Sequence, residues 1–138
     1  MTARSALLNP ASAGVYRTPA DVAILRDCAG ATLTWWEIDL GSVRTKHDLM
    51  NAFAAACGYP GTFGHNWDAL ADVLQDFSWE HAAGYVLHLC HADRARVSLG
   101  ADWRVLLDVL DESASYWKVR ERAFVVFVDG ATEFASWR

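Results

Sequence analysis

Apolar residues along the chain follow two different periods, which predicts strands and helices in alternation. Residues 32–40 are rich in β-forming side chains, and Trp36, Ile38 and Leu40 alternate there with acids, as in a strand with one buried face. Residues 84–92 and 123–129 are almost continuously apolar, which is typical of strands that are buried on both faces.

Three helices are predicted between these strands. Residues 45–57 open with Thr45 and Asp48, close to a capping box, and Gly58 ends the helix. Residues 67–77 carry an apolar stripe at helical spacing, formed by Leu70, Val73, Leu74 and Phe77. A third helix should span residues 103–116 with its leucines turned inward, namely Leu106, Leu107 and Leu110.

The first 30 residues carry a weaker pattern. We expect residues 1–14 to be loosely ordered and residues 14–18 to form a short strand. Thr18 and Pro19 resemble an N-cap followed by proline at the first helical position, and a short helix would then end at Gly30. We therefore predict an N-terminal extension over residues 1–30 and a main domain over residues 31–138.

Strands that are separated by helices favour a parallel sheet with right-handed connections. The length of 138 residues suits one domain. We predict an α/β fold, a small three-layer sandwich whose three-stranded parallel sheet carries helices packed on it, with the extension appended.

The amino-acid composition limits the kinds of molecule that this protein could bind. The formal net charge is −5 and the twelve Lys and Arg residues are scattered, which argues against nucleic acid and favours a basic protein partner. The three cysteines are widely spaced and odd in number, so they indicate no disulfide framework. The N-terminus lacks the apolar core of a signal peptide, and no stretch is long enough to span a membrane. We expect a cytoplasmic protein that binds no membrane.

Three acids recur every fourth residue in the predicted helix over residues 67–77: Asp68, Asp72 and Asp76. Like charges at this spacing weaken a helix by about 0.2–0.5 kcal/mol per pair, and the helix dipole favours only Asp68 in the first turn. The row is therefore a solvated face, a docking surface for a cationic partner, or a site where two acids share a divalent metal. No further carboxylate or catalytic base has an obvious place beside them, so we expect no metal.

The segment FGHNWDALAD, residues 63–72, resembles the signature of the barstar family, the intracellular inhibitors of secreted bacterial ribonucleases. That signature reads aromatic-Gly-x-Asn-aromatic/Leu-Asp-Ala-Leu-x-Asp, and the match has no gap. The order of elements is also similar over roughly residues 33–130, which implies a barstar-like fold for the main domain.

The resemblance implies an inhibitor and not an enzyme. Asp72 matches the acid that enters the phosphate pocket of a basic ribonuclease, and Asp68 matches the flanking acid. No catalytic residue, cofactor or metal is implied. The expected partner-binding residues are Thr62, Phe63, Gly64, His65, Asn66, Asp68, Ala71, Asp72 and Asp76.

Two departures from the pattern keep a second hypothesis open. Thr62 and Ala71 stand where barstar has aromatic residues, and aromatics often anchor interfaces. The alternative is a barstar-fold binding module for a different basic toxin or regulatory protein. A third is a metal-dependent enzyme that uses Asp68 and Asp72. The resemblance also implies a further acid of the interface, in the region of the next long helix. Three residues of this chain are candidates for it and none is preferred: Asp108, Asp111 and Glu112.

Other residues suggest chemistry less strongly. His88, Cys90 and His91 invite a metal interpretation, but on a strand His88 and His91 point to opposite faces, so we expect structural roles. We expect Cys57 to be a core residue and not a nucleophile. Trp35 must face away from Trp36, and we expect it to pack against the N-terminal segment. His65 either contacts the partner or holds its loop.

Overall fold

The computed structural model of the chain describes residues 3–30, 32–58, 64–77, 82–130 and 134–137. In chain order the elements are α1 (Ala3–Leu8), η1 (Pro10–Ser12), β1 (Gly14–Arg17), α2 (Val22–Ala29), β2 (Leu33–Asp39), α3 (Lys46–Cys57), α4 (Trp67–Leu74), β3 (Gly84–Cys90), α5 (Asp93–Leu99), α6 (Ala101–Val119) and β4 (Ala123–Val128). None of the helices in these ranges combines the length and the apolar character that crossing a membrane requires.

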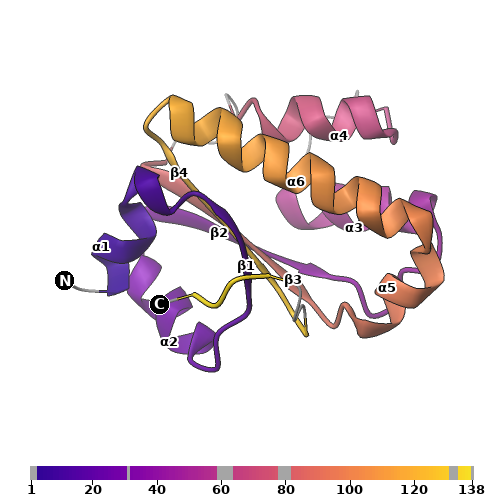
Figure 1. The fold of residues 1–138 in the computed structure, drawn as a ribbon, viewed down its shortest axis with the longest axis horizontal. Helices are drawn as coiled ribbons and strands as arrows, with labels where there is room; N and C mark the ends of the chain where they lie inside the picture. The colour runs from indigo at the N-terminus through magenta and orange to yellow at the C-terminus, as the bar shows by residue number, and fades with distance from the viewer. Residues whose placement is uncertain (1–2, 31, 59–63, 78–81, 131–133, 138) are drawn as a thin grey trace.

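The strands form one parallel sheet in the order β1-β4-β3-β2 (Figure 1). The three predicted strands and their parallel pairing are confirmed. The sheet is one strand wider than predicted, because β1 from the N-terminal extension pairs with β4 at its edge. Thr18 prolongs this contact, since its backbone N–H donates to the carbonyl of Val128 at 3.2 Å.

Helices cover both faces of the sheet, which gives the predicted three layers (Figure 1). The larger core lies between the sheet and α3, α4 and α6, and Trp36 and Ile38 of β2 point into it. The smaller core lies between the sheet and the extension, where Leu7 of α1 and Leu25 of α2 meet the other face. Trp35 packs against this smaller core, on the sheet face that the N-terminal extension covers.

The N-terminal extension differs from the prediction in two places. Residues 3–8 form a helix instead of a loose segment, and Leu7 is fully buried against the sheet. The helix predicted to start at Thr18 begins at Val22 with Asp21 in the N-cap position, because Thr18 is still bonded to β4. Its end at Gly30 is as predicted. The boundary at residue 30 stays a prediction.

The helices of the main domain follow their sequence signals closely. The capping box of α3 is formed, with Thr45 Oγ1 accepting from the backbone N–H of Asp48 at 3.1 Å, and Gly58 ends the helix in the left-handed region at φ 66°. Helix α6 is longer than predicted, and its leucines Leu106 and Leu110 are fully buried. Helix α5 was not predicted.

Candidate functional site

Helix α4 carries the acids singled out from the sequence, and its start is firmly built. The side chain of Asn66 caps the helix by accepting from the backbone N–H of Ala69 at 2.8 Å. Gly64 leaves room for this cap, because a Cβ atom there would lie 3.2 Å from Asn66 Nδ2. His65 makes the turn between them in the left-handed region, at φ 56°.

The apolar side of α4 is anchored in the larger core. Leu70 and Leu74 are fully buried, and Trp117 of α6 donates its indole N–H to the carbonyl of Leu74 at 2.8 Å. Phe77 is buried just beyond the helix, with its ring 5.0 Å from that of Trp36 and 4.3 Å from that of Tyr85. The predicted apolar stripe is therefore confirmed, although α4 ends at Leu74 and not at Phe77.

The acidic side of α4 faces outward. Asp68 and Asp72 are exposed, and within the part of the chain that the structure describes neither carboxylate forms an ion pair or a side-chain hydrogen bond. Asp76 is also exposed, but it lies two residues after the end of α4, so the expected row of three on one helix is reduced to two. We call Asp68 and Asp72 the acidic pair.

The remaining predicted partner-binding residues surround the acidic pair or lie outside the description. His65 is exposed and its ring stacks on that of His47 in α3, with centroids 5.7 Å apart. Ala71 is half-buried against the core. Thr62 and Phe63 fall outside the described residues.

The three candidates for a further acid lie on α6, and all are exposed. Asp108 and Asp111 border a hollow together with Phe134, and no described residue of α4 lines it. The hollow therefore does not connect these acids with the acidic pair. The structure gives no reason to select one of the three candidates.

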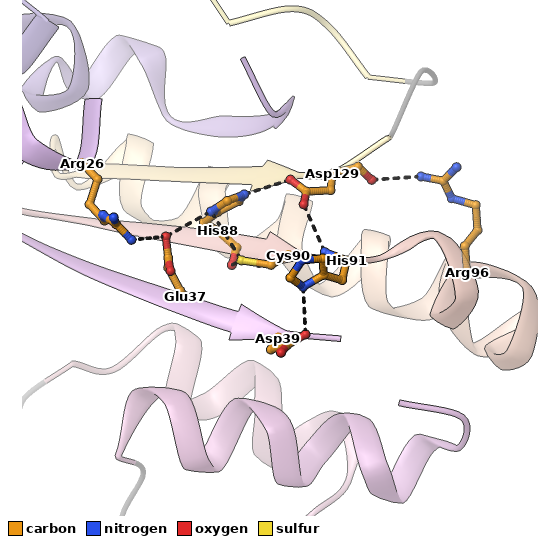
Figure 2. A network of polar contacts seen from close by, with 8 residues as sticks. All are labelled: Arg26, Glu37, Asp39, His88, Cys90, His91, Arg96 and Asp129. Carbon is orange, nitrogen blue, oxygen red and sulfur yellow. Dashed lines mark hydrogen bonds and ion pairs between the residues drawn. The ribbon is translucent and has the colours of Figure 1, made fainter. Parts of the chain in front are cut away.

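A second polar cluster was not predicted. It lies where β2, β3 and β4 end, on the sheet face that carries α1 and α2, and we call it the strand-end network (Figure 2). Its members are Arg26, Glu37, Asp39, His88, Cys90, His91, Arg96 and Asp129.

His88 is the centre of the strand-end network and is 7% exposed. Its Nε2 lies 2.8 Å from Asp129 Oδ1, and its Nδ1 lies 3.4 Å from Glu37 Oε2 and 3.5 Å from Cys90 Sγ. Arg26 of α2 pairs with the same oxygen of Glu37 at 2.7 Å. The strand-end network therefore joins the N-terminal extension to three strands of the sheet.

The pKa values of Asp129 and Cys90 are shifted by their surroundings in the network. Burial alone would raise the pKa of Asp129, but the hydrogen bonds from His88, Thr18 and the backbone of His91 hold it below its ordinary value. Burial, and then the neighbouring carboxylates of Glu37 and Asp129, raise the pKa of the Cys90 thiol to about 12. The thiol is thus a poor nucleophile, although His88 and Asp129 stand beside it in the order of a catalytic triad.

This network is not evident from the pattern along any one strand, because its members lie on or directly after three strands and on two helices. Histidine 91 is not part of β3: it follows Cys90 with φ 55°, and its backbone N–H donates to Asp129 Oδ2 at 3.0 Å. The expectation that it lies across the sheet from His88 is therefore wrong. The available signal was that each buried strand ends in polar residues, which meet because carboxyl ends of parallel strands share one edge.

Comparison with models of known protein families shows which family the main domain matches. The family model described as Barstar (barnase inhibitor) matches residues 33–129, from the start of β2 to just past the end of β4. A comparison with curated proteins finds no match. The matched residues make up most of the chain and include α4 with the acidic pair. The chain therefore belongs to the barstar family, a family of barnase inhibitors.

Proposed function

We propose that this protein inhibits a basic ribonuclease of the secreted type by inserting the acidic pair of α4 into its active site. One observation carries the proposal. The family match includes α4, and there Asp68 and Asp72 stand exposed on a firmly anchored helix with no partner among the described residues.

The chemistry of a ribonuclease active site suits this arrangement. Such a site holds cationic side chains that bind the phosphates of RNA, and a carboxylate presents oxygens of similar charge. Hydrogen bonds between such ions are roughly twice as strong as those between neutral groups. In this proposal Asp72 occupies the phosphate pocket and Asp68 pairs with a basic group beside it, so RNA is excluded without any reaction on the inhibitor.

The border of the interface follows from the turn that leads into α4. We assign Gly64, His65 and Asn66 to it because they lie directly before the acidic pair, and Asn66 also fixes the angle of the helix. Thr62, Phe63, Ala71 and Asp76 complete the proposed surface. An inhibitor of this kind needs no cofactor, and it would act in the cytoplasm, where it meets the ribonuclease before secretion.

A second candidate is a binding module for a different basic toxin or regulatory protein. Ala71 favours this candidate, because the small side chain provides no aromatic anchor beside Asp72. Both candidates use the acidic pair, and they differ in whether a barnase-like ribonuclease is held.

The test is RNA cleavage by a barnase-like ribonuclease titrated with this protein at low and at physiological salt. We expect stoichiometric inhibition, weakened at least tenfold (about 1.4 kcal/mol) by Asp72→Ala and weakened further by salt, which screens charges. Asp27→Ala is the matched control, since Asp27 is an exposed acid on α2 at the other face of the sheet. Absence of inhibition at both salt concentrations would reject the ribonuclease and favour the second candidate.

A further inference from the structure

The strand-end network contains three side chains whose ligand atoms converge on one point (Figure 2). A carboxylate oxygen of Glu37, Nδ1 of His88 and Sγ of Cys90 all lie within 4.8 Å of one another. Glu37 is opposite His88 in the pairing of β2 with β3, and Cys90 follows His88 by two residues on the same face. The fold itself therefore brings the three together.

The two ring nitrogens of His88 face different partners. Asp129 can only accept, and its Oδ1 lies 2.8 Å from Nε2, so Nε2 is the nitrogen that donates to it. Nδ1 lies on the other side of a nine-tenths buried ring, where it faces the carboxylate oxygen of Glu37 at 3.4 Å and the sulfur of Cys90 at 3.5 Å. A metal ion bound at Nδ1 would therefore have the other two ligand atoms beside it.

Two of the three spacings between the ligand atoms fit tetrahedral Zn²⁺. With Zn–N and Zn–O bonds of about 2.0 Å and a Zn–S bond of about 2.3 Å, such an ion holds its ligands roughly 3.3 Å (N to O) and 3.5 Å (S to N) apart. The corresponding distances are 3.4 Å from His88 Nδ1 to Glu37 Oε2 and 3.5 Å from His88 Nδ1 to Cys90 Sγ.

We propose that Glu37, His88 and Cys90 form a Zn²⁺ site at the carboxyl ends of β2 and β3, with the fourth coordination position open to water. Asp129 is a positioning residue, because a carboxylate on the second nitrogen of a ligating histidine fixes the ring and raises its basicity. Binding expels the thiol proton of Cys90, so the two anionic ligands balance the charge of the ion.

Arg26 is the cation that contacts one of the three proposed ligands, and its position is compatible with a metal. It contacts Oε2 of Glu37 at 2.7 Å, while the second carboxylate oxygen of Glu37 remains as a partner for it when Oε2 binds Zn²⁺. Asp39 and Asp129 add negative charge around the three ligands. The site lies on the sheet face opposite α4, so it is independent of the proposed inhibition.

The test uses the full chain with Zn²⁺ and a chromophoric chelator of micromolar affinity as competitor. We expect one equivalent to bind, and Cys90→Ser and Glu37→Gln each to weaken binding more than tenfold. Both altered side chains are partly or largely exposed, so these variants should fold, which circular dichroism checks. Cys28→Ser is the matched control, since it removes a half-buried cysteine from α2.

Co²⁺ provides a readout of the ligand set that a general effect on folding would not produce. The wild-type protein and Cys28→Ser should show the near-ultraviolet charge-transfer band of a cobalt–thiolate bond, and Cys90→Ser should lose it. The site is overturned if the protein fails to compete with the chelator, if the band is absent, or if Cys28→Ser weakens binding as much as Cys90→Ser.

Discussion

The acidic pair of α4 and the strand-end network both present carboxylates, but the fold treats the two groups in opposite ways. Asp68 and Asp72 have no partner among the described residues. Asp129, by contrast, accepts hydrogen bonds both from the ring of His88 and from the backbone N–H of His91. A carboxylate that is already satisfied contributes to the stability of the fold. A carboxylate that is not satisfied remains available to another molecule, as the proposed inhibition requires.

The largest effect should come from the apolar side of the acidic helix. Phe77→Ala removes a buried ring that packs on Trp36, Tyr85, Trp117 and Phe124. We expect the free energy of unfolding to fall by about 3–5 kcal/mol, because truncation of a buried phenylalanine leaves a cavity. Urea denaturation measures this. A loss below about 1 kcal/mol would show that α4 does not depend on this anchor.

Next in size is removal of the satisfied carboxylate. Asp129→Ala leaves Nε2 of buried His88 and the backbone N–H of His91 without their acceptor. We expect a loss of about 1–3 kcal/mol in unfolding free energy, measured with a chelator present, because unpaired buried donors are costly. Asp27→Ala serves as the exposed control and should change stability by less than about 0.5 kcal/mol. Inhibition of a ribonuclease by the folded variant should be unchanged.

Asp48 is another carboxylate that accepts hydrogen bonds, and its effect on stability can be tested by changing the pH. The backbone N–H of Arg44, assisted by groups of Thr45, holds the pKa of Asp48 below its ordinary value. A lowered pKa in the folded state contributes stability above the ordinary pKa of aspartate, and this contribution is lost as pH falls through the lowered value. The difference in unfolding free energy between wild type and Asp48→Ala should therefore shrink on acidification. A difference that stays constant with pH would contradict this.

The smallest effect on stability should come from the acidic pair, and its sign should be reversed. Asp72→Asn removes the repulsion between Asp68 and Asp72 one helical turn apart, so the protein should gain roughly 0.2–0.5 kcal/mol. The same variant should inhibit a ribonuclease less well. Chemical denaturation and RNA cleavage measured on one preparation compare both quantities, and a variant that loses stability would show that Asp72 serves the fold.

The sequence predicts most of the acidic helix because its signals are local. The leucines at helical spacing and the two acids all lie within seven residues, from 68 to 74, and short-range rules apply to them directly. The position of Asp76 was misjudged because an apolar stripe does not show where a helix ends: Phe77 is buried although α4 has already ended at Leu74.

The strand-end network could not be predicted in the same way, because it depends on pairing between distant segments. Glu37, His88 and Asp129 meet only once β2, β3 and β4 are aligned in register. The role of Thr18 was missed for the same reason. Its local context favours a helix start, but its backbone N–H donates to the carbonyl of Val128 on the neighbouring strand β4, which is more than 100 residues away in the sequence.

The pairing of β1 with β4 has a consequence for the order in which the protein folds. Of the four strands that the structure describes, β1 is synthesised first, yet its neighbour in the sheet is β4, which is synthesised last of the four. Helices α1 and α2 share this dependence, since part of the apolar surface that they cover is supplied by Val125 and Phe127 of β4. Contacts of such long sequence separation form slowly. The N-terminal extension can therefore dock fully only after β4 has been synthesised.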